Sequence, residues 1–159
     1  MFTNHDTIWG DDPDTRRIHY GYMIYLGGAP VCWRSKLHAS VALSTAESEY
    51  IAACECVKQV ALVHSLLSFL QSPVAEPTVI YEHNMECVHM IRNKIVSGRN
   101  KHVKLRAHFV RELHVTGQIK LVYIVTVDQY ADGLTKILSR PAFERHRDTL
   151  LSGPPARDE

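Results

Sequence analysis

The chain has 159 residues, of which 45% are hydrophobic and 22% are charged. This length corresponds to about one ordinary domain, and both fractions are close to globular averages, which excludes a disordered or fibrous chain. The net charge is only +1, so bulk electrostatics do not predict a nucleic-acid-binding protein, and any contact with nucleic acid must be local.

The sequence shows no targeting segment. Residues 1–6 lack the basic start and apolar run of a signal peptide, and the longest apolar runs fall far short of the ~20 residues that span a bilayer. The four cysteines have no C-x-x-C spacing, which favours buried thiols in a reducing compartment. We therefore expect an intracellular protein, cytoplasmic or nuclear.

The first half of the chain predicts a β-hairpin followed by a long helix. Residues 18–26 alternate in hydrophobicity, and a Gly-Gly turn signal joins them to a second short run at 31–33. A helix is expected from Ser44 to about residue 70, because Ser44 followed by Glu47 fits a capping box. Its apolar faces indicate that it lies against a sheet.

The second half predicts a strand at 78–81, helices at 85–92 and 101–115, a strand at 119–125 and a last core helix at 129–138. The order β-β-β-α-β-α-α-β-α suits a mixed α/β sheet with helices on its faces. Beyond it we expect a short charged C-terminal helix and a flexible tail. The predicted division is therefore a domain over 1–138 and this extension over 139–159.

Several motifs occur in a specific order along the chain, although each alone is weak. They are Trp9 to Arg17, Gly21-Tyr22, Leu26 to Gly28, Trp33 to Lys36, Leu43 to Tyr50, Lys101 to Val103, His108 to Glu112 and Ala131 to Lys136. In this order and spacing the chain resembles the ribonuclease H domain of copia-type LTR retrotransposon Pol polyproteins, from near Met1 to about Leu138.

The resemblance implies a ribonuclease H-like mixed sheet and the metal-dependent hydrolysis of the RNA strand of RNA–DNA hybrids during reverse transcription. In this family four carboxylates hold Mg²⁺ or Mn²⁺, and two ions can stabilise both the attacking water and the leaving oxygen. The resemblance also implies former attachment to a reverse transcriptase domain. Because Met1 falls just before the first acid, we expect a shortened first strand.

Three of the four acids are carried over by position: Asp6, Glu49 and Asp132 match catalytic metal ligands of the family. Asp6 has the alternative role of a turn or helix cap, and Asp132 that of a first-turn residue favoured by the helix dipole. Glu47 is assigned to the capping box, so the metal is assigned to Glu49.

The third acid of the family is replaced here by His83. Histidine removes a negative charge and offers nitrogen, which suits zinc or other transition metals better than Mg²⁺. We therefore expect weak or absent catalysis, with or without a bound ion; a sharper alternative is that His83 recruits Mn²⁺ or Zn²⁺. The adjacent Glu82 is expected on the opposite face of its strand, as a poor substitute.

Local basic residues are the candidates for contacts with the phosphates of a hybrid, which is read by backbone shape and 2′-hydroxyls. They are Arg16, Arg17, Lys36, Arg99, Lys101 and His102. Ordinary solvated surface charges are the alternative for each.

Three functional classes therefore remain open. The first is an active ribonuclease H domain, and the second is a non-catalytic hybrid-binding or structural relic domain of the same fold. The third is a protein-interaction module without a nucleic-acid role.

Overall fold

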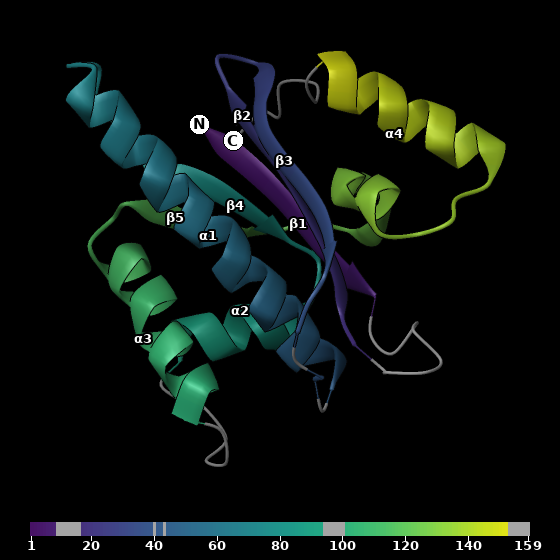
Figure 1. The fold of residues 1–159 in the computed structure, drawn as a ribbon, viewed down its shortest axis with the longest axis horizontal. Helices are drawn as coiled ribbons and strands as arrows, with labels where there is room; N and C mark the ends of the chain where they lie inside the picture. The colour runs from purple at the N-terminus through teal and green to yellow at the C-terminus, as the bar shows by residue number, and fades with distance from the viewer. Residues whose placement is uncertain (9–16, 40, 43, 94–100, 153–159) are drawn as a thin grey trace.

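A five-stranded mixed sheet forms the centre of the protein (Figure 1). The computed structural model describes residues 1–8, 17–39, 41–42, 44–93 and 101–152, without the side chains of 101–107. The strand order is β3-β2-β1-β4-β5, antiparallel between the first three strands and parallel from β1 to β4 and from β4 to β5. The strands are β1 (Phe2–Ile8), β2 (His19–Leu26), β3 (Ala29–Leu37), β4 (Thr78–Glu82) and β5 (Ile119–Tyr123).

The strand that we expected to be shortened, β1, occupies the middle of the sheet. It has seven residues, all of which are paired with β2, and Phe2, Thr3 and Asn4 are also paired with β4. Because both of its edges are covered, its interior positions are buried even where they are polar. The polar residues at 3–7 therefore lie inside the fold and not on its surface.

The predicted hairpin is confirmed. Strands β2 and β3 pair in antiparallel register and are joined at Gly27 and Gly28, which have φ values of +60° and +83°. Positive φ is accessible to glycine at little steric cost, so these two residues allow the tight reversal.

The predicted long helix is also confirmed: α1 spans Thr45–Phe69 and begins at Ser44, whose side chain accepts a hydrogen bond from Glu47 N. Its buried residues lie between 46 and 60 and pack on the sheet. By length and composition α1 is the one described helix apolar enough to cross a membrane. Its packing against β1 and β2 accounts for that apolar character within this fold.

Two further helices share the face of the sheet that α1 covers (Figure 1). They are α2 (Met85–Arg92) and α3 (Lys101–Val115), at the predicted places. The core between these helices and the sheet contains the buried thiols of Cys54, Cys56 and Cys87. All four cysteines are free, as expected from their spacing.

The predicted last core helix at 129–138 is wrong. Two short 3₁₀ helices, η1 (Thr126–Asp128) and η2 (Tyr130–Leu134), take its place. The main chain closes i→i−3 hydrogen bonds here, as in Asp132 N to the Gln129 carbonyl. The close approach of residues 134 and 135 to Gly21 on β2 explains the difference, because it holds the chain against the sheet.

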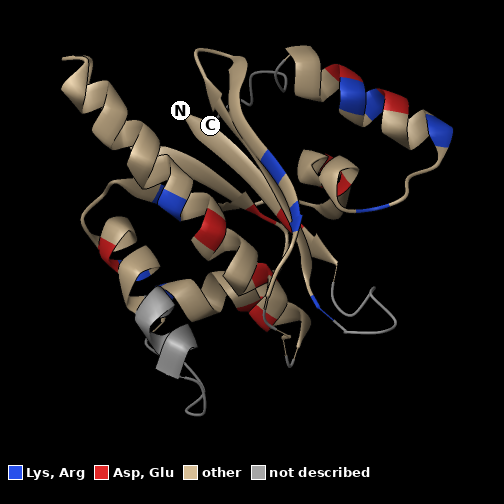
Figure 2. Cartoon of the chain, in the orientation of Figure 1, with Lys and Arg blue, Asp and Glu red and all other residues tan. Residues whose placement is uncertain are grey.

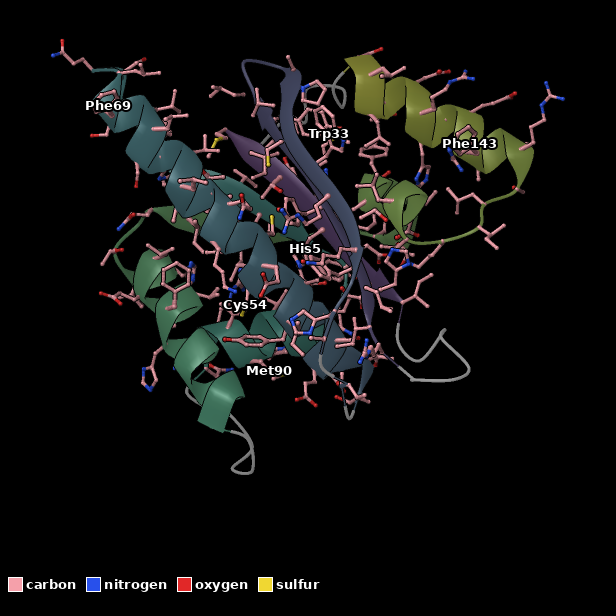
Figure 3. The ribbon with its side chains drawn as sticks, viewed as in Figure 1. His5, Trp33, Cys54, Phe69, Met90 and Phe143 are labelled. Carbon is pink, nitrogen blue, oxygen red and sulfur yellow. The ribbon has the colours of Figure 1, made fainter. Side chains whose placement is uncertain are left out.

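The expected charged helix is α4 (Arg140–Ser152), on the opposite face of the sheet from α1 (Figures 1 and 2). It packs on η2 through the buried His146, whose ring meets Tyr130 edge to face. An apolar pocket lies between α4 and the hairpin, with Trp33 on β3 and Phe143 on α4 among its lining residues (Figure 3).

Candidate active site

Three residues singled out in the sequence converge at one edge of the sheet. Asp6 lies near the end of β1, Glu49 lies in α1, and His83 directly follows β4. One ligand atom from each lies within 4.8 Å of the others. The Nε2 atom of His83 is 3.9 Å from Asp6 Oδ1 and 3.7 Å from Glu49 Oε1.

The fold explains this convergence. Because β1 and β4 are parallel neighbours, Asp6 and His83 reach the same edge of the sheet. The Ser44 cap starts α1 at this edge, and Glu49 follows one turn later. The partial positive charge of the helix N-terminus also favours carboxylates there.

The fourth predicted residue, Asp132, joins the site through a lysine. Lys136 Nζ is 2.9 Å from Asp132 Oδ1 and 3.1 Å from Asp6 Oδ1. The Thr135 hydroxyl also donates a hydrogen bond to Asp6 Oδ2. The sequence motif contained Lys136 and Thr135 but gave them no role; the i,i+4 spacing of Asp132 and Lys136 was the available signal for the pair.

Burial dominates the electrostatics of the site. Burial, followed by the charge of Asp132, raises the pKa of Asp6 to about 7, against the opposing effects of Lys136 and Thr135. Burial, followed by the charges of Glu82 and Asp6, raises the pKa of Glu49 well above its usual value. Burial lowers the pKa of His83, which favours its neutral imidazole.

Glu82 was expected on the opposite face of its strand, as a poor substitute for the missing acid, yet it lies near the carboxylate of Glu49. Its side chain does point to the face that α1 covers, but Glu49 comes from α1 and meets it there. Glu82 is fully buried, and its Oε2 lies 3.0 Å from Nε2 of His5, a residue that sequence reasoning missed. The two residues meet only through strand pairing, so no spacing in the sequence signalled this contact.

The structure describes the side chains of two of the six basic candidates. Arg17 and Lys36 are exposed, and Lys36 is paired with Tyr20 at the end of the hairpin where Gly21 faces Asp6. Figure 2 shows basic positions along β3 toward this end. Arg16 and Arg99 lie outside the described residues, as do the side chains of Lys101 and His102.

The donor set fits a divalent cation. Asp6 and Glu49 offer carboxylate oxygens, and His83 offers a neutral imidazole nitrogen. Glu49 Oε2 is buried and has no hydrogen-bond partner among the described residues. A buried carboxylate oxygen without a partner is costly, and a cation would offset that cost.

Comparisons of the sequence find transposon Pol polyproteins among the relatives of the chain. The chain is 36% identical over 139 residues to the retrovirus-related Pol polyprotein from transposon RE2 of Arabidopsis thaliana, and 34% identical to that from transposon TNT 1-94 of Nicotiana tabacum. Each match covers 87% of the chain, which spans about 10% of the length of these curated relatives. No protein-family model matches the chain.

Comparisons of the structure show the fold. The N-terminal RNase H domain of Rv2228c from Mycobacterium tuberculosis superposes with a TM-score of 0.57 at 10% identity, covering 93% of this chain and 96% of that one. LC11-RNase H1, solved in complex with an RNA/DNA hybrid, gives 0.57 at 14% identity, with 84% and 91% covered. The chain is therefore homologous to a part of the Pol polyproteins of copia-type transposons, and it has a ribonuclease H-like fold.

Proposed function

We propose that this ribonuclease H-like domain binds RNA–DNA hybrids and hydrolyses their RNA strand only weakly, with Mg²⁺ or Mn²⁺ as cofactor. The observation that carries the proposal is the convergence of Asp6, Glu49 and His83 within 4.8 Å, at the edge of a ribonuclease H-like sheet. The hybrid bound to LC11-RNase H1 supports this substrate class. The Pol relatives support a place within a longer polyprotein, and the likeness to the prototype foamy virus protease–reverse transcriptase supports a place beside a reverse transcriptase.

The residues divide the work as follows. Asp6, Glu49 and Asp132 would hold the divalent ions, which supply positive charge where phosphodiester hydrolysis develops negative charge. Thr135 and Lys136 fix the carboxylate of Asp6 through hydrogen bonds to both of its oxygens. Arg17 and Lys36, exposed at the same end of the hairpin, are placed to contact phosphates.

His83 is the reason for the weak activity. A neutral imidazole in place of a carboxylate removes one negative charge and leaves one nitrogen for the ion. Replacing a residue that only hydrogen-bonds to a metal ligand already costs about 10–100-fold in affinity or activity. Replacing a ligand itself should cost at least as much.

A second candidate function is hybrid binding without hydrolysis. The contact of Lys136 with both Asp6 and Asp132 favours it, because the ammonium already neutralises charge that an ion would otherwise neutralise. The two candidates share the fold and the binding surface and differ only in turnover.

A cleavage assay on the intact chain tests the proposal. A labelled RNA–DNA hybrid is incubated with the wild type, His83→Asp and the matched control His83→Asn, in Mg²⁺ and in Mn²⁺. We expect His83→Asp to cut at least about tenfold faster than the wild type, while His83→Asn does not gain, because only Asp restores the missing charge. Equal rates for all three proteins would contradict the role of His83.

Hybrid binding is measured separately, so that the second candidate is decided as well. We expect binding that weakens as salt rises, since phosphate contacts release counterions. Binding without cleavage by either His83 variant would establish the non-catalytic function. Absence of both binding and cleavage at low salt would overturn both candidates and favour a module without a nucleic-acid role.

A further inference from the structure

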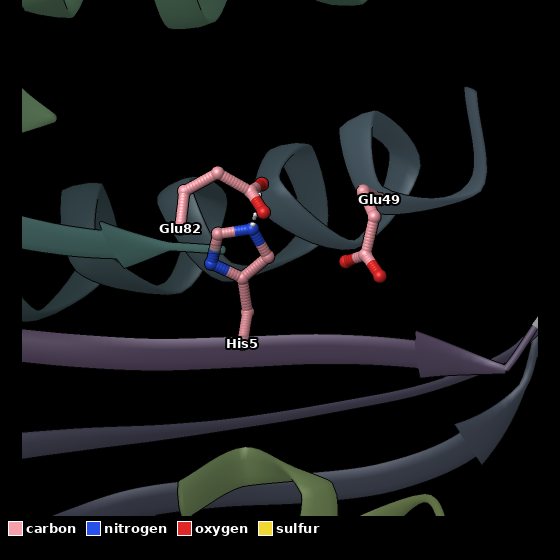
Figure 4. Close-up of side chains that lie close together, drawn as sticks. All are labelled: His5, Glu49 and Glu82. Atoms are coloured by element: carbon pink, nitrogen blue, oxygen red, sulfur yellow. Dashed lines mark hydrogen bonds and ion pairs between the residues drawn. The ribbon is translucent and has the colours of Figure 1, made fainter. Parts of the chain in front are cut away.

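A second group of titratable side chains lies on the α1 side of the sheet (Figure 4). It consists of His5 on β1, Glu82 at the end of β4 and Glu49 on α1. His5 and Glu82 are fully buried, and Glu49 is 5% exposed. One ligand atom from each lies within 4.8 Å of the other two, and Figure 4 shows the Glu49 carboxylate beside the imidazole.

The hydrogen bond between His5 and Glu82 does not account for the whole group. Glu49 Oε2 and His5 Nδ1 are buried, and within the described part of the chain neither has a hydrogen-bond partner. Buried polar atoms are nearly always satisfied in folded proteins, and the carboxylate oxygen of Glu49 is the atom of this group that a bound cation would satisfy.

The charge around this group is also unbalanced. Four buried carboxylates meet at this end of the sheet, those of Asp6, Glu49, Glu82 and Asp132. Among the described residues, Lys136 is the only lysine or arginine in an ion pair with any of these four carboxylates. Buried carboxylates are stabilised by protonation or by a paired positive charge, and a bound cation would supply such a charge.

We propose that His5, Glu49 and Glu82 form a binding site for a divalent transition-metal ion, with one imidazole nitrogen and two carboxylate oxygens as ligands. The site is distinct from the pair Asp6 and His83, but shares Glu49 with it. It does not depend on hybrid cleavage.

The spacing of two of the three donors fits such an ion. His5 Nε2 and Glu82 Oε2 are 3.0 Å apart. Two ligands bound at about 2.1 Å, at angles between octahedral and tetrahedral, lie about 3.0–3.4 Å from each other. The 3.0 Å between His5 Nε2 and Glu82 Oε2 is therefore short enough for both atoms to bind one ion. Binding would replace the hydrogen bond and release its proton.

The ligand types set the class of ion. Imidazole with carboxylates suits Zn²⁺, Mn²⁺ or Fe²⁺, whereas Mg²⁺ prefers oxygen ligands alone and retains its waters. In this position the ion would link β1 and β4 to α1, next to the carboxylates of the candidate active site. Its expected effect is to hold Glu49 in place and to stabilise the fold.

The site is tested by titrating the intact, metal-free chain with Co²⁺ and recording its visible absorption. The binding of Zn²⁺ is measured separately by calorimetry. The test variant is the double substitution His5→Leu with Glu82→Met; the matched control is Asp6→Asn with His83→Asn. Replacing a buried ion pair by apolar residues of similar volume is often neutral or stabilising, so the test variant is expected to fold. Circular dichroism checks this.

We expect the test variant to lose one bound ion per chain, or at least about tenfold in affinity, and with that ion the part of the Co²⁺ absorption that belongs to His5 and that the control retains. Zn²⁺ should raise the Tm of the control, and it should raise that of the test variant less than that of the wild type. Identical stoichiometry, affinity and spectra for the wild type and the test variant would overturn the inference, and the group would then be a buried ion pair.

A second variant covers the case in which the double variant does not fold, and the choice of residues separates this site from the proposed function. If the double variant does not fold, His5→Gln removes the ligand nitrogen and keeps a polar side chain, and the same comparison applies. The test variant retains Asp6, Glu49, His83 and Asp132. A loss of bound Co²⁺ in a chain whose wild type neither binds nor cuts hybrids therefore supports this site while the proposed function fails.

Discussion

Lys136 and Asp6 are ion-paired beside the centre of the sheet, with Nζ 3.1 Å from Oδ1, although 130 residues separate them in the chain. The same ammonium lies 2.9 Å from Asp132. It therefore neutralises part of the charge of two carboxylates that face one another across the candidate active site. A divalent ion held by those carboxylates would compete with this lysine.

Replacing Lys136 by methionine tests this competition. Loss of one partner of a buried pair costs about 3–5 kcal/mol, and partial exposure of the lysine lowers that cost. We expect the unfolding free energy without divalent ions to fall by roughly 1–3 kcal/mol in urea titrations with a chelator. Added Mn²⁺ should then stabilise the variant more than it stabilises the wild type.

The exposed Lys120 on β5 provides the matched control. Lys120→Met should change the unfolding free energy by less than about 0.5 kcal/mol, as surface substitutions usually do. If Lys136→Met behaves like this control in both measurements, the lysine does not compete with an ion.

The raised pKa of Asp6 makes the stability of the metal-free protein depend on pH. Its carboxyl has a pKa of about 7 in the folded protein against an ordinary value of 3.8. Between these values the folded state binds more protons than the unfolded state, so the unfolding free energy falls as pH rises from about 4 to about 7.

Asp6→Asn removes this contribution. We expect the decline between pH 4 and pH 7 to become shallower in the variant, in urea titrations at several pH values with a chelator present. It should not vanish, because burial also raises the pKa of Glu49, which contributes with the same sign. Parallel curves for the two proteins would show that Asp6 titrates normally in the folded state.

Local patterns predicted much of the fold, because they act over a few residues. The Gly27-Gly28 turn and the Ser44 cap are set by backbone conformation and neighbouring side chains, and both are as predicted. The resemblance to the family predicted that Asp6, Glu49 and His83 share one site, and the structure brings them together. The prediction was possible because the family's motifs occupy known positions in its fold.

Contacts set by tertiary packing were not predictable in this way. The 3₁₀ helix η2 replaces a predicted α-helix because residues 134 and 135 are held against Gly21 on β2. The pair of His5 and Glu82 depends on the register of β1 with β4. Neither relation appears in the spacing of the sequence.

The cap of α1 gives a further prediction. Ser44→Ala removes the acceptor of the hydrogen bond from Glu47 N and should lower the unfolding free energy by about 1 kcal/mol. The matched control is Ser65→Ala on the same helix, where the hydroxyl only bonds back to the Ala61 carbonyl and lies exposed. The control should stay within about 0.5 kcal/mol of the wild type. Equal losses in thermal and urea unfolding would mean that the cap contributes nothing specific.

Gly21 sets the distance between β2 and the segment that carries Asp132. A Cβ added there would lie 2.7 Å from Leu134 Cβ, closer than real contacts allow, and 3.0 Å from Thr135 Cγ2, which is a tight contact. Gly21→Ala should therefore push this segment outward, at a cost of about 1–3 kcal/mol for overpacking. Because Thr135 and Lys136 hold Asp6, the displacement should also weaken the stabilisation of the protein by Mn²⁺.

Gly133→Ala is the control in the same segment, since its added Cβ would meet His146 Cβ at 3.5 Å, an ordinary contact. Both variants are compared by urea unfolding and by the rise in Tm that Mn²⁺ produces. We expect Gly21→Ala to lose both stability and part of that rise, while Gly133→Ala keeps the rise. If Gly21→Ala loses stability but responds to Mn²⁺ as the wild type does, the position of Asp132 does not depend on the contact between β2 and η2.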